Sequence, residues 1–164
     1  SSVGWVACAG FASMASSQGH LAQAAFASAM AGALLGFLVH NFPPAKVFLG
    51  DSGSMLVGLV LGALAIRTSL KSPTAVTMFG CLAILALPIF DSSMAIVRRK
   101  LTGRSIFSTD RGHLHHNLIT RGYSQAKLVL IVTLLSAVLA FGAAFSVRYQ
   151  NQLIALAAVL IVLG

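Results

Sequence analysis

Apolar residues fill most of the chain in long runs, and short polar breaks separate one run from the next. The runs predict six helices, at about residues 1–17, 21–39, 54–70, 73–90, 124–147 and from 150 onward. Several of them approach the roughly 20 residues that a helix needs to cross the hydrocarbon core of a bilayer. The pattern therefore predicts an all-α fold, a polytopic transmembrane helical bundle, in which residues 1–164 form a single domain with about six spans.

Two longer polar segments, residues 40–53 and 91–123, interrupt this pattern. Two predicted spans lie between them, and because that number of crossings is even, both segments should face the same compartment. The second segment carries six of the eleven Lys and Arg residues, and basic loops mark the cytoplasmic side of a membrane protein. We therefore expect a multi-pass protein of the inner (plasma) membrane with both segments on the cytoplasmic face. All three acidic residues, Asp51, Asp91 and Asp110, then lie on that face.

The composition supports a membrane protein. The chain is 57% hydrophobic and 9% charged, with a mean hydropathy of +0.90, whereas about a quarter of the residues in soluble domains are charged. Basic cytoplasmic loops account for the net charge of +8, so we expect no nucleic-acid partner. Cys8 and Cys81 lie inside apolar runs without metal-binding spacing, which predicts buried free thiols.

Small residues recur at a spacing of four, at Gly32 and Gly36 and again at Ser54, Gly58 and Gly62. This spacing lets membrane helices approach one another closely. We expect these positions to serve helix packing rather than catalysis.

Pro88 precedes Asp91 by three residues in "LPIFDSS". A proline inside a helix removes a backbone hydrogen bond and bends the helix, which can turn Asp91 toward a central cleft. The alternative is a proline near a frayed helix end. Beyond it, apolar positions within 94–101 share one helical face, which is typical of a short helix at the membrane interface or of an ordinary solvated helix end.

Asp51, in "NFPPAKVFLGDSGS", lies between two long apolar runs. An ionised carboxylate at such a place is costly unless it is paired or coordinates a cation, so it is a candidate functional group. Its small neighbours leave backbone N–H groups free to face a phosphate at the start of the next span. The alternative is a purely structural N-cap. Lys46, in the same loop, either pairs with a phosphate or flanks the membrane.

The second polar segment contains "TDRGHLHH", with Asp110, Arg111, His113, His115 and His116. Three histidines within four positions are compatible with a zinc site. Nearby arginines repel a cation that is not already paired with an anionic substrate, and Arg and His together suit a diphosphate. We favour anion binding over structural zinc, and Asp110 can orient one of the imidazoles.

Two motifs, "NFPPAKVFLGDSGS" and, two spans later, "LPIFDSSMAIVRRKLTGRSIFSTDRGHLHH", resemble the C-terminal half of the polyprenyl-phosphate N-acetylhexosamine-1-phosphate transferases, glycosyltransferase family 4. These are integral membrane enzymes that make the first lipid-linked sugar of cell-wall and surface polysaccharides. The resemblance extends over the whole chain. The form "DRGHLHH" is closer to the undecaprenyl-phosphate GlcNAc-1-phosphate transferase branch than to the muramoyl-pentapeptide branch, whose loop usually has three adjacent histidines.

The resemblance assigns roles to matching positions. It implies that Asp51 is a ligand of Mg²⁺, the expected cofactor, and that Phe48 and Asn41 help to form the nucleotide pocket. The resemblance also implies that the three loop histidines bind the diphosphate. Arg111 is a further substrate-binding candidate on its own chemistry, since Arg suits a diphosphate. A phosphate oxygen of polyprenyl (undecaprenyl) phosphate would attack the sugar-bearing phosphate of a UDP-N-acetylhexosamine, and UMP would leave. Mg²⁺ suits this role because it usually takes one or two carboxylates together with phosphate oxygens and water. The expected partners are these two substrates and the lipid bilayer, with a homodimer as the assembly.

The paired aspartates and the Asn-rich segment of the family do not occur in this sequence. The chain also begins with Ser and ends inside an apolar run, and its first run lacks the charged start of a signal peptide. We therefore expect part of a longer enzyme, inactive on its own. Two alternatives remain, an intramembrane aspartyl protease and a transporter or channel. The protease motif GxGD needs Gly where Phe48 stands, and a transporter leaves the basic, His-rich loop unexplained.

Overall fold

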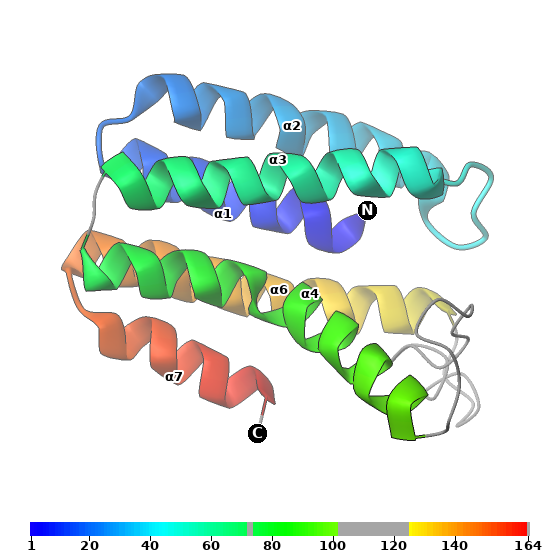
Figure 1. The fold of residues 1–164 in the computed structure, drawn as a ribbon. Helices are drawn as coiled ribbons and strands as arrows, with labels where there is room; N and C mark the ends of the chain where they lie inside the picture. Colours follow the sequence, from blue (N-terminus) through cyan, green and yellow to red (C-terminus); the bar gives the residue numbers. More distant parts are fainter. Residues whose placement is uncertain (72–73, 102–124, 164) are drawn as a thin grey trace.

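The computed structural model describes residues 1–71, 74–101 and 125–163, and all regular structure in these ranges is helical. The helices, in chain order, are α1 (Ser2–Ser17), α2 (Leu21–Asn41), α3 (Gly50–Lys71), α4 (Ala75–Leu101), α6 (Gln125–Tyr149) and α7 (Gln152–Leu163). Figure 1 shows them lying side by side, with α1, α2 and α3 in one group and α4, α6 and α7 in the other. The predicted all-α bundle is confirmed.

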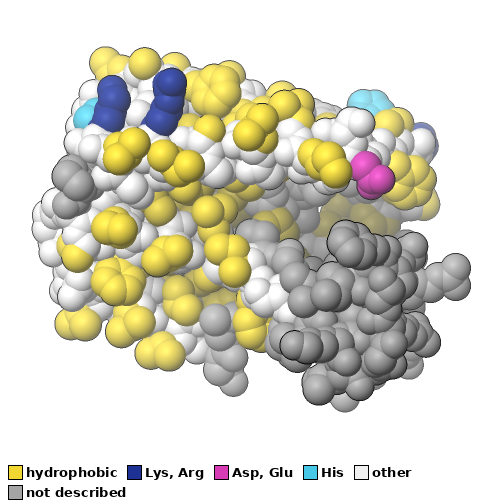
Figure 2. All heavy atoms as spheres, viewed as in Figure 1, with side chains coloured by type: hydrophobic (Ala, Val, Ile, Leu, Met, Phe, Trp, Pro, Cys, Tyr) yellow, Lys and Arg dark blue, Asp and Glu magenta, His cyan; other side chains and the backbone are white. Residues whose placement is uncertain are grey.

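The exterior of the bundle is apolar. Large side chains such as Leu59, Phe141 and Leu160 are mostly exposed, and Figure 2 shows hydrophobic side chains spread over much of the visible face. Among the described residues, three helical stretches, Leu21–Asn41, Gly50–Lys71 and Val129–Tyr149, are long and apolar enough to cross a membrane by length and composition. A surface of this kind is compatible with lipid rather than water, so the chain is a helical membrane protein.

The core centres on α1, which packs against α2 on one side and α6 on the other. Its Cys8, Phe11 and Met14 are fully buried, as is Leu139 of α6. Both cysteines are buried free thiols, as the sequence predicts.

Close approach between helices occurs at glycines other than those predicted. A Cβ atom added at Gly10 of α1 would lie 2.9 Å from the Cβ of Ala140 on α6, and one added at Gly142 of α6 would lie 2.5 Å from the Cβ of Ala158 on α7. By contrast, no atom of the described residues lies within 4 Å of a Cβ built at the predicted packing positions, Gly32, Gly36, Gly58 and Gly62. The packing expectation for those glycines is therefore wrong within this part of the chain, since spacing alone cannot tell which face of a helix meets a neighbour.

Two helix boundaries differ from the hydrophobic pattern. Helix α3 begins at Gly50 rather than near residue 54, and α4 continues to Leu101 instead of ending near residue 90. Hydropathy marks the apolar part of a helix, whereas polar residues extend its ends beyond that part. Pro88 lies halfway along α4, and Figure 1 shows α4 changing direction about midway, as expected of a proline within a helix.

The bundle has two ends. At one, here called the Asp51 end, α2 ends and α3 begins; at the other, the far end, α3 ends and α4 begins. Hydrogen bonds close the far end: Gln18 Nε2 donates to Thr77 Oγ1 at 3.0 Å, and Ser146 Oγ donates to the carbonyl oxygen of Asn151 at 2.8 Å. Thr74 caps α4, because its Oγ1 accepts from the Thr77 N–H at 3.2 Å.

Candidate active site

The loop between α2 and α3 is held by Asn41, the last residue of α2. The Asn41 Nδ2 donates to the carbonyl oxygen of Val47 at 2.9 Å, and its Oδ1 accepts from the hydroxyl of Ser1. The loop closes further through the Lys46 N–H, which donates to the carbonyl oxygen of His40 at 3.0 Å. Asn41 therefore joins the start of α1, the end of α2 and the loop, a role that the local sequence did not predict because Ser1 lies 40 residues away.

Two glycines shape the start of α3. Gly50 has a φ of +67°, a left-handed conformation that glycine adopts without the steric cost of a side chain. A Cβ at Gly53 would lie 2.7 Å from Leu49 Cγ, so the absence of a side chain at Gly53 leaves room for Leu49 against the first turn of α3. The "GDSG" stretch thus turns the chain sharply and starts the helix at once.

Asp51 lies in the first turn of α3 and is exposed. A negative charge at this position is favourable, since the free N–H groups and the helix dipole give the N-terminus of a helix a partial positive charge. The Ser54 hydroxyl donates to the Asp51 carbonyl oxygen at 2.9 Å. Because Asp51 is inside the helix, the alternative of a purely structural N-cap does not describe it.

The side chains of Phe48 and Lys46, in the same loop, are both exposed. The Phe48 side chain is 78% exposed, which is unusual for a ring of this size, and Lys46 is exposed as well. Asn41, Lys46, Phe48 and Asp51 therefore lie at one end of the bundle, on one loop and the helix turn that follows it. An aromatic face, a cation and a carboxylate in this arrangement can meet a nucleobase, a phosphate and a metal ion.

The remaining predicted site residues, Arg111, His113, His115 and His116, lie in 102–124, outside the described residues, and so does Asp110. The helices that flank this segment are described. Helix α4 ends and α6 begins at the Asp51 end of the bundle (Figure 1). The chain therefore leaves and re-enters the described structure on the side where Asp51 lies.

No group of three or more His, Cys, Asp or Glu residues within 1–71, 74–101 and 125–163 is placed to hold a metal ion. Asp51 would thus supply one carboxylate, and other ligands would have to come from substrate, water or residues outside these ranges. This donor set fits Mg²⁺, which commonly takes one or two protein carboxylates.

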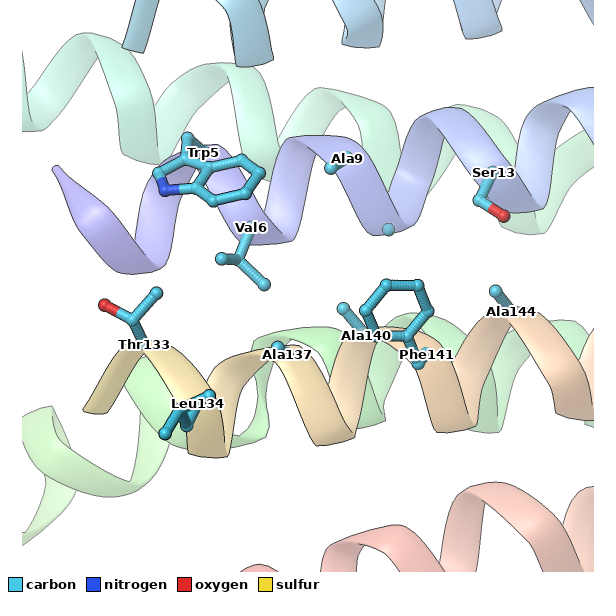
Figure 3. A pocket seen from close by; sticks show the side chains of 11 residues that line it. Trp5, Val6, Ala9, Ser13, Thr133, Leu134, Ala137, Ala140, Phe141 and Ala144 are labelled. Atoms are coloured by element: carbon cyan, nitrogen blue, oxygen red, sulfur yellow. The ribbon is translucent and has the colours of Figure 1, made fainter. Parts of the chain in front are cut away.

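An apolar cavity of about 270 Å³ lies between α1 and α6. Figure 3 shows Val6 of α1 pointing toward α6 and Phe141 of α6 pointing toward α1. The lining side chains offer the hydroxyls of Ser13 and Thr133, and the Thr133 hydroxyl already donates to the Val129 carbonyl oxygen at 2.6 Å. No charged side chain lines this cavity, so it is unsuited to a diphosphate.

Comparisons with known proteins point to one family. The model of glycosyl transferase family 4 matches residues 1–69. The decaprenyl-phosphate N-acetylglucosaminephosphotransferase of Mycobacterium tuberculosis (strain H37Rv) is 43% identical over 136 residues, which cover 75% of this chain and 33% of that protein. A probable undecaprenyl-phosphate N-acetylglucosaminyl 1-phosphate transferase of Bacillus subtilis is 38% identical, with 66% of this chain and 30% of that protein covered.

A second branch also matches. The phospho-N-acetylmuramoyl-pentapeptide-transferase of Moorella thermoacetica is 36% identical over 137 residues, which cover 83% of this chain and 41% of that protein. The chain thus spans about a third of the length of the curated relatives that it matches. No solved structure shows a significant match to the chain.

Proposed function

The chain belongs to the polyprenyl-phosphate N-acetylhexosamine-1-phosphate transferases of glycosyl transferase family 4, and from this premise we propose a reaction for the protein that contains it. That protein transfers an N-acetylhexosamine 1-phosphate from a UDP-sugar to a polyprenyl phosphate at the cytoplasmic face of the plasma membrane. A phosphate oxygen of the lipid attacks the sugar-bearing phosphorus of the UDP-sugar. The new P–O bond forms as the diphosphate P–O bond breaks, and UMP leaves.

The observation that carries the proposal is the exposed Asp51 carboxylate at the start of α3, at the end of the bundle from which the basic, His-rich segment extends. Two anionic substrates repel one another, so their reaction needs positive charge around the phosphates. Lys46 lies on the loop beside Asp51, and Arg111 with His113, His115 and His116 would add cationic donors from the second segment.

Asp51 would hold Mg²⁺, and the bound ion would polarise the diphosphate and neutralise charge on the phosphate oxygens. The other roles fall to the chain's own side chains. Phe48 presents an exposed ring on which the uracil can stack. Asn41 fixes the loop that carries Phe48 and Lys46.

The donor sugar in this proposal is UDP-N-acetylglucosamine. Identity to the N-acetylglucosaminephosphotransferase of Mycobacterium tuberculosis is 43%, against 36% to the muramoyl-pentapeptide transferase of Moorella thermoacetica. The loop form "DRGHLHH" supports the same branch. The acceptor would be undecaprenyl or decaprenyl phosphate, by analogy with the names of these relatives.

The proposal can be tested with the purified full-length protein, to which polyprenyl phosphate and UDP-N-acetylglucosamine are added. The release of UMP is then measured. Wild-type protein should turn over in the presence of Mg²⁺. Asp51→Asn should lower the rate by at least ~100-fold while the protein still inserts into membranes, and Asp51→Glu, which keeps the charge, should retain measurable activity. Normal Mg²⁺-dependent turnover by Asp51→Asn would exclude Asp51 as the metal ligand, and absence of UMP release by the wild type with every UDP-hexosamine would reject the reaction.

A further inference from the structure

A second candidate site lies at the far end of the bundle, in a cleft of about 370 Å³ between α2 and α3. Gln23 and Phe26 of α2 line one wall, and Leu64, Arg67 and Lys71 of α3 line the other. Figure 2 shows basic side chains gathered at this end and the acidic side chain at the opposite end. The cleft is therefore remote from the proposed active site.

Gln23 has an amide with no partner. The residue is 7% exposed, and neither Nε2 nor Oε1 makes a hydrogen bond to any described residue. A buried polar atom without a partner destabilises a fold by roughly 1–3 kcal/mol, so native structures rarely keep one without compensation. The amide of Gln23 can both donate to a phosphate oxygen and accept from a headgroup hydroxyl. Both of its polar atoms are shielded from solvent, so a ligand reaches them only by entering the cleft as far as the Gln23 side chain.

The two cations of the cleft also lack an acidic partner among the described residues. Arg67 and Lys71 are four residues apart on α3 and so lie on the same side of the helix. Asp51 lies 16 residues before Arg67 on the same helix, a separation of about 24 Å at 1.5 Å per residue. No ion pair joins Arg67 or Lys71 to another described residue. Basic residues are uncommon at the non-cytoplasmic side of membrane proteins, which is where the proposed topology puts them, so this pair calls for a specific explanation.

The remaining lining is apolar, and all of it except the buried Leu64 is exposed. Phe26 is 55% exposed, and Ala22 and Ala63 are exposed beside it. The cleft thus has cations in the last two turns of a predicted membrane span and an apolar wall further into the span. This order of charge and apolar surface matches the order of headgroup and acyl chain in a phospholipid.

We propose that this cleft binds an anionic phospholipid, with its phosphate held by Arg67, Lys71 and the Gln23 amide and an acyl chain along Phe26 and Ala63. Charge-assisted hydrogen bonds from Arg to phosphate are strong and geometrically selective. Basic pockets between membrane helices are a known way for proteins to recognise acidic headgroups. The apolar wall favours a lipid over free phosphate, which would leave Phe26 without a partner.

The delipidated full-length protein, reconstituted in phosphatidylcholine nanodiscs with and without added phosphatidylglycerol, tests this proposal. Thermal unfolding should occur at a higher temperature with phosphatidylglycerol, and native mass spectrometry should show tightly bound phosphatidylglycerol. Inorganic phosphate at the same concentration should give no such increase. An increase with inorganic phosphate alone, or equal stability in both lipids, would overturn the lipid site.

A matched pair of variants locates the site. Arg67→Gln should weaken phosphatidylglycerol binding roughly tenfold. Arg148→Gln removes the same charge at the same end. Arg148 lines a neighbouring cleft that shares only Lys71 with the proposed site, so Arg148→Gln should leave binding within about twofold of wild type. Equal losses in both variants would indicate a diffuse charge effect, and loss only in Arg148→Gln would place the lipid in the other cleft; either result rejects the proposal.

Gln23→Leu separates ligand binding from a purely structural role. Because it removes the unpaired amide, this variant should unfold at a higher temperature than wild type in phosphatidylcholine alone. Its unfolding temperature should, however, rise less than that of wild type when phosphatidylglycerol is added. A gain equal to that of wild type would show that Gln23 does not contact the headgroup. If Arg67→Gln also kept the full gain, the site would be rejected.

Discussion

At the scale of single residues, Asn41 shows how one side chain positions a site. Its amide donates to the carbonyl of Val47 and accepts from Ser1, so each of its two polar atoms makes one hydrogen bond within the fold. The family resemblance places Asn41 in the nucleotide pocket, whereas these hydrogen bonds give it a positioning role, in which it holds the loop that presents Phe48. The two roles predict different consequences of its removal.

We expect Asn41→Leu, which has a similar volume but neither polar atom, to lower the free energy of unfolding by about 1–3 kcal/mol, because two hydrogen bonds are lost and their partners are left unpaired. Loosening of the loop should raise the KM for the UDP-sugar more than it lowers kcat. Denaturation in detergent and steady-state kinetics of the full-length protein measure the two effects. Ser1→Ala, which removes only one of the hydrogen bonds, should lie between wild type and Asn41→Leu. Unchanged stability with lost nucleotide binding would instead assign Asn41 a direct contact with the nucleotide.

At the scale of helices, the order and approximate extent of all six described helices follow from the apolar runs, because in a membrane each helix must be apolar along its buried length. The boundaries at Gly50 and Leu101 do not follow from those runs, since the polar ends of α3 and α4 remain helical outside the apolar part. The packing glycines could not be identified either. Spacing marks Gly58 and Gly62, while the contacts that need glycine occur at Gly10 and Gly142.

Sequence patterns also cannot show which residues of different helices come together to form a site. Sequence motifs can propose Asp51, Phe48 and Lys46 as site residues because these residues are neighbours in one stretch of the chain. They could not identify the Gln23 cleft, because Gln23 and Arg67 lie on different helices and are 44 residues apart in the chain. A lone Gln in an apolar run is a weak signal, and only its burial without a partner makes it informative.

Gly10 and Gly58 form a matched pair for testing helix packing. We expect Gly10→Ala to lower the free energy of unfolding by about 1–3 kcal/mol, because the new methyl group would lie 2.9 Å from the Cβ of Ala140 and the helices would have to separate. Gly58→Ala meets no described atom within 4 Å, and alanine favours a helix over glycine by roughly 0.5–1 kcal/mol. Gly58→Ala should therefore be neutral or stabilising in chemical denaturation of the full-length protein. A loss as large as that of Gly10→Ala would show that another segment packs on Gly58.

At the scale of the whole molecule, the two ends of the bundle differ in charge. Arg67, Lys71 and Arg148 lie at the far end, within the last turns of α3 and α6. The Asp51 end carries Lys46 and the basic end of α4, and 102–124 continues the chain from there. More basic residues belong to the Asp51 end, so by the positive-inside rule we propose that this end faces the cytoplasm. The proposed reaction and the proposed lipid site would then lie on opposite faces of the same bundle.

Cysteine labelling tests this orientation, in full-length protein with Cys8, Cys81 and any other cysteine replaced. Ser52 and Asn151 are both exposed, one at each end of the bundle. Three helices, α3, α4 and α6, separate them, and an odd number of crossings puts them in different compartments. Ser52→Cys should resist an impermeant maleimide added to intact cells, whereas Asn151→Cys should react, and permeabilisation should make Ser52→Cys reactive. If both cysteines reacted in intact cells, the number of crossings would be wrong. If only Ser52→Cys reacted, Asp51 would face outward, away from the nucleotide sugar of the cytoplasm, and the proposed transfer could not occur at Asp51.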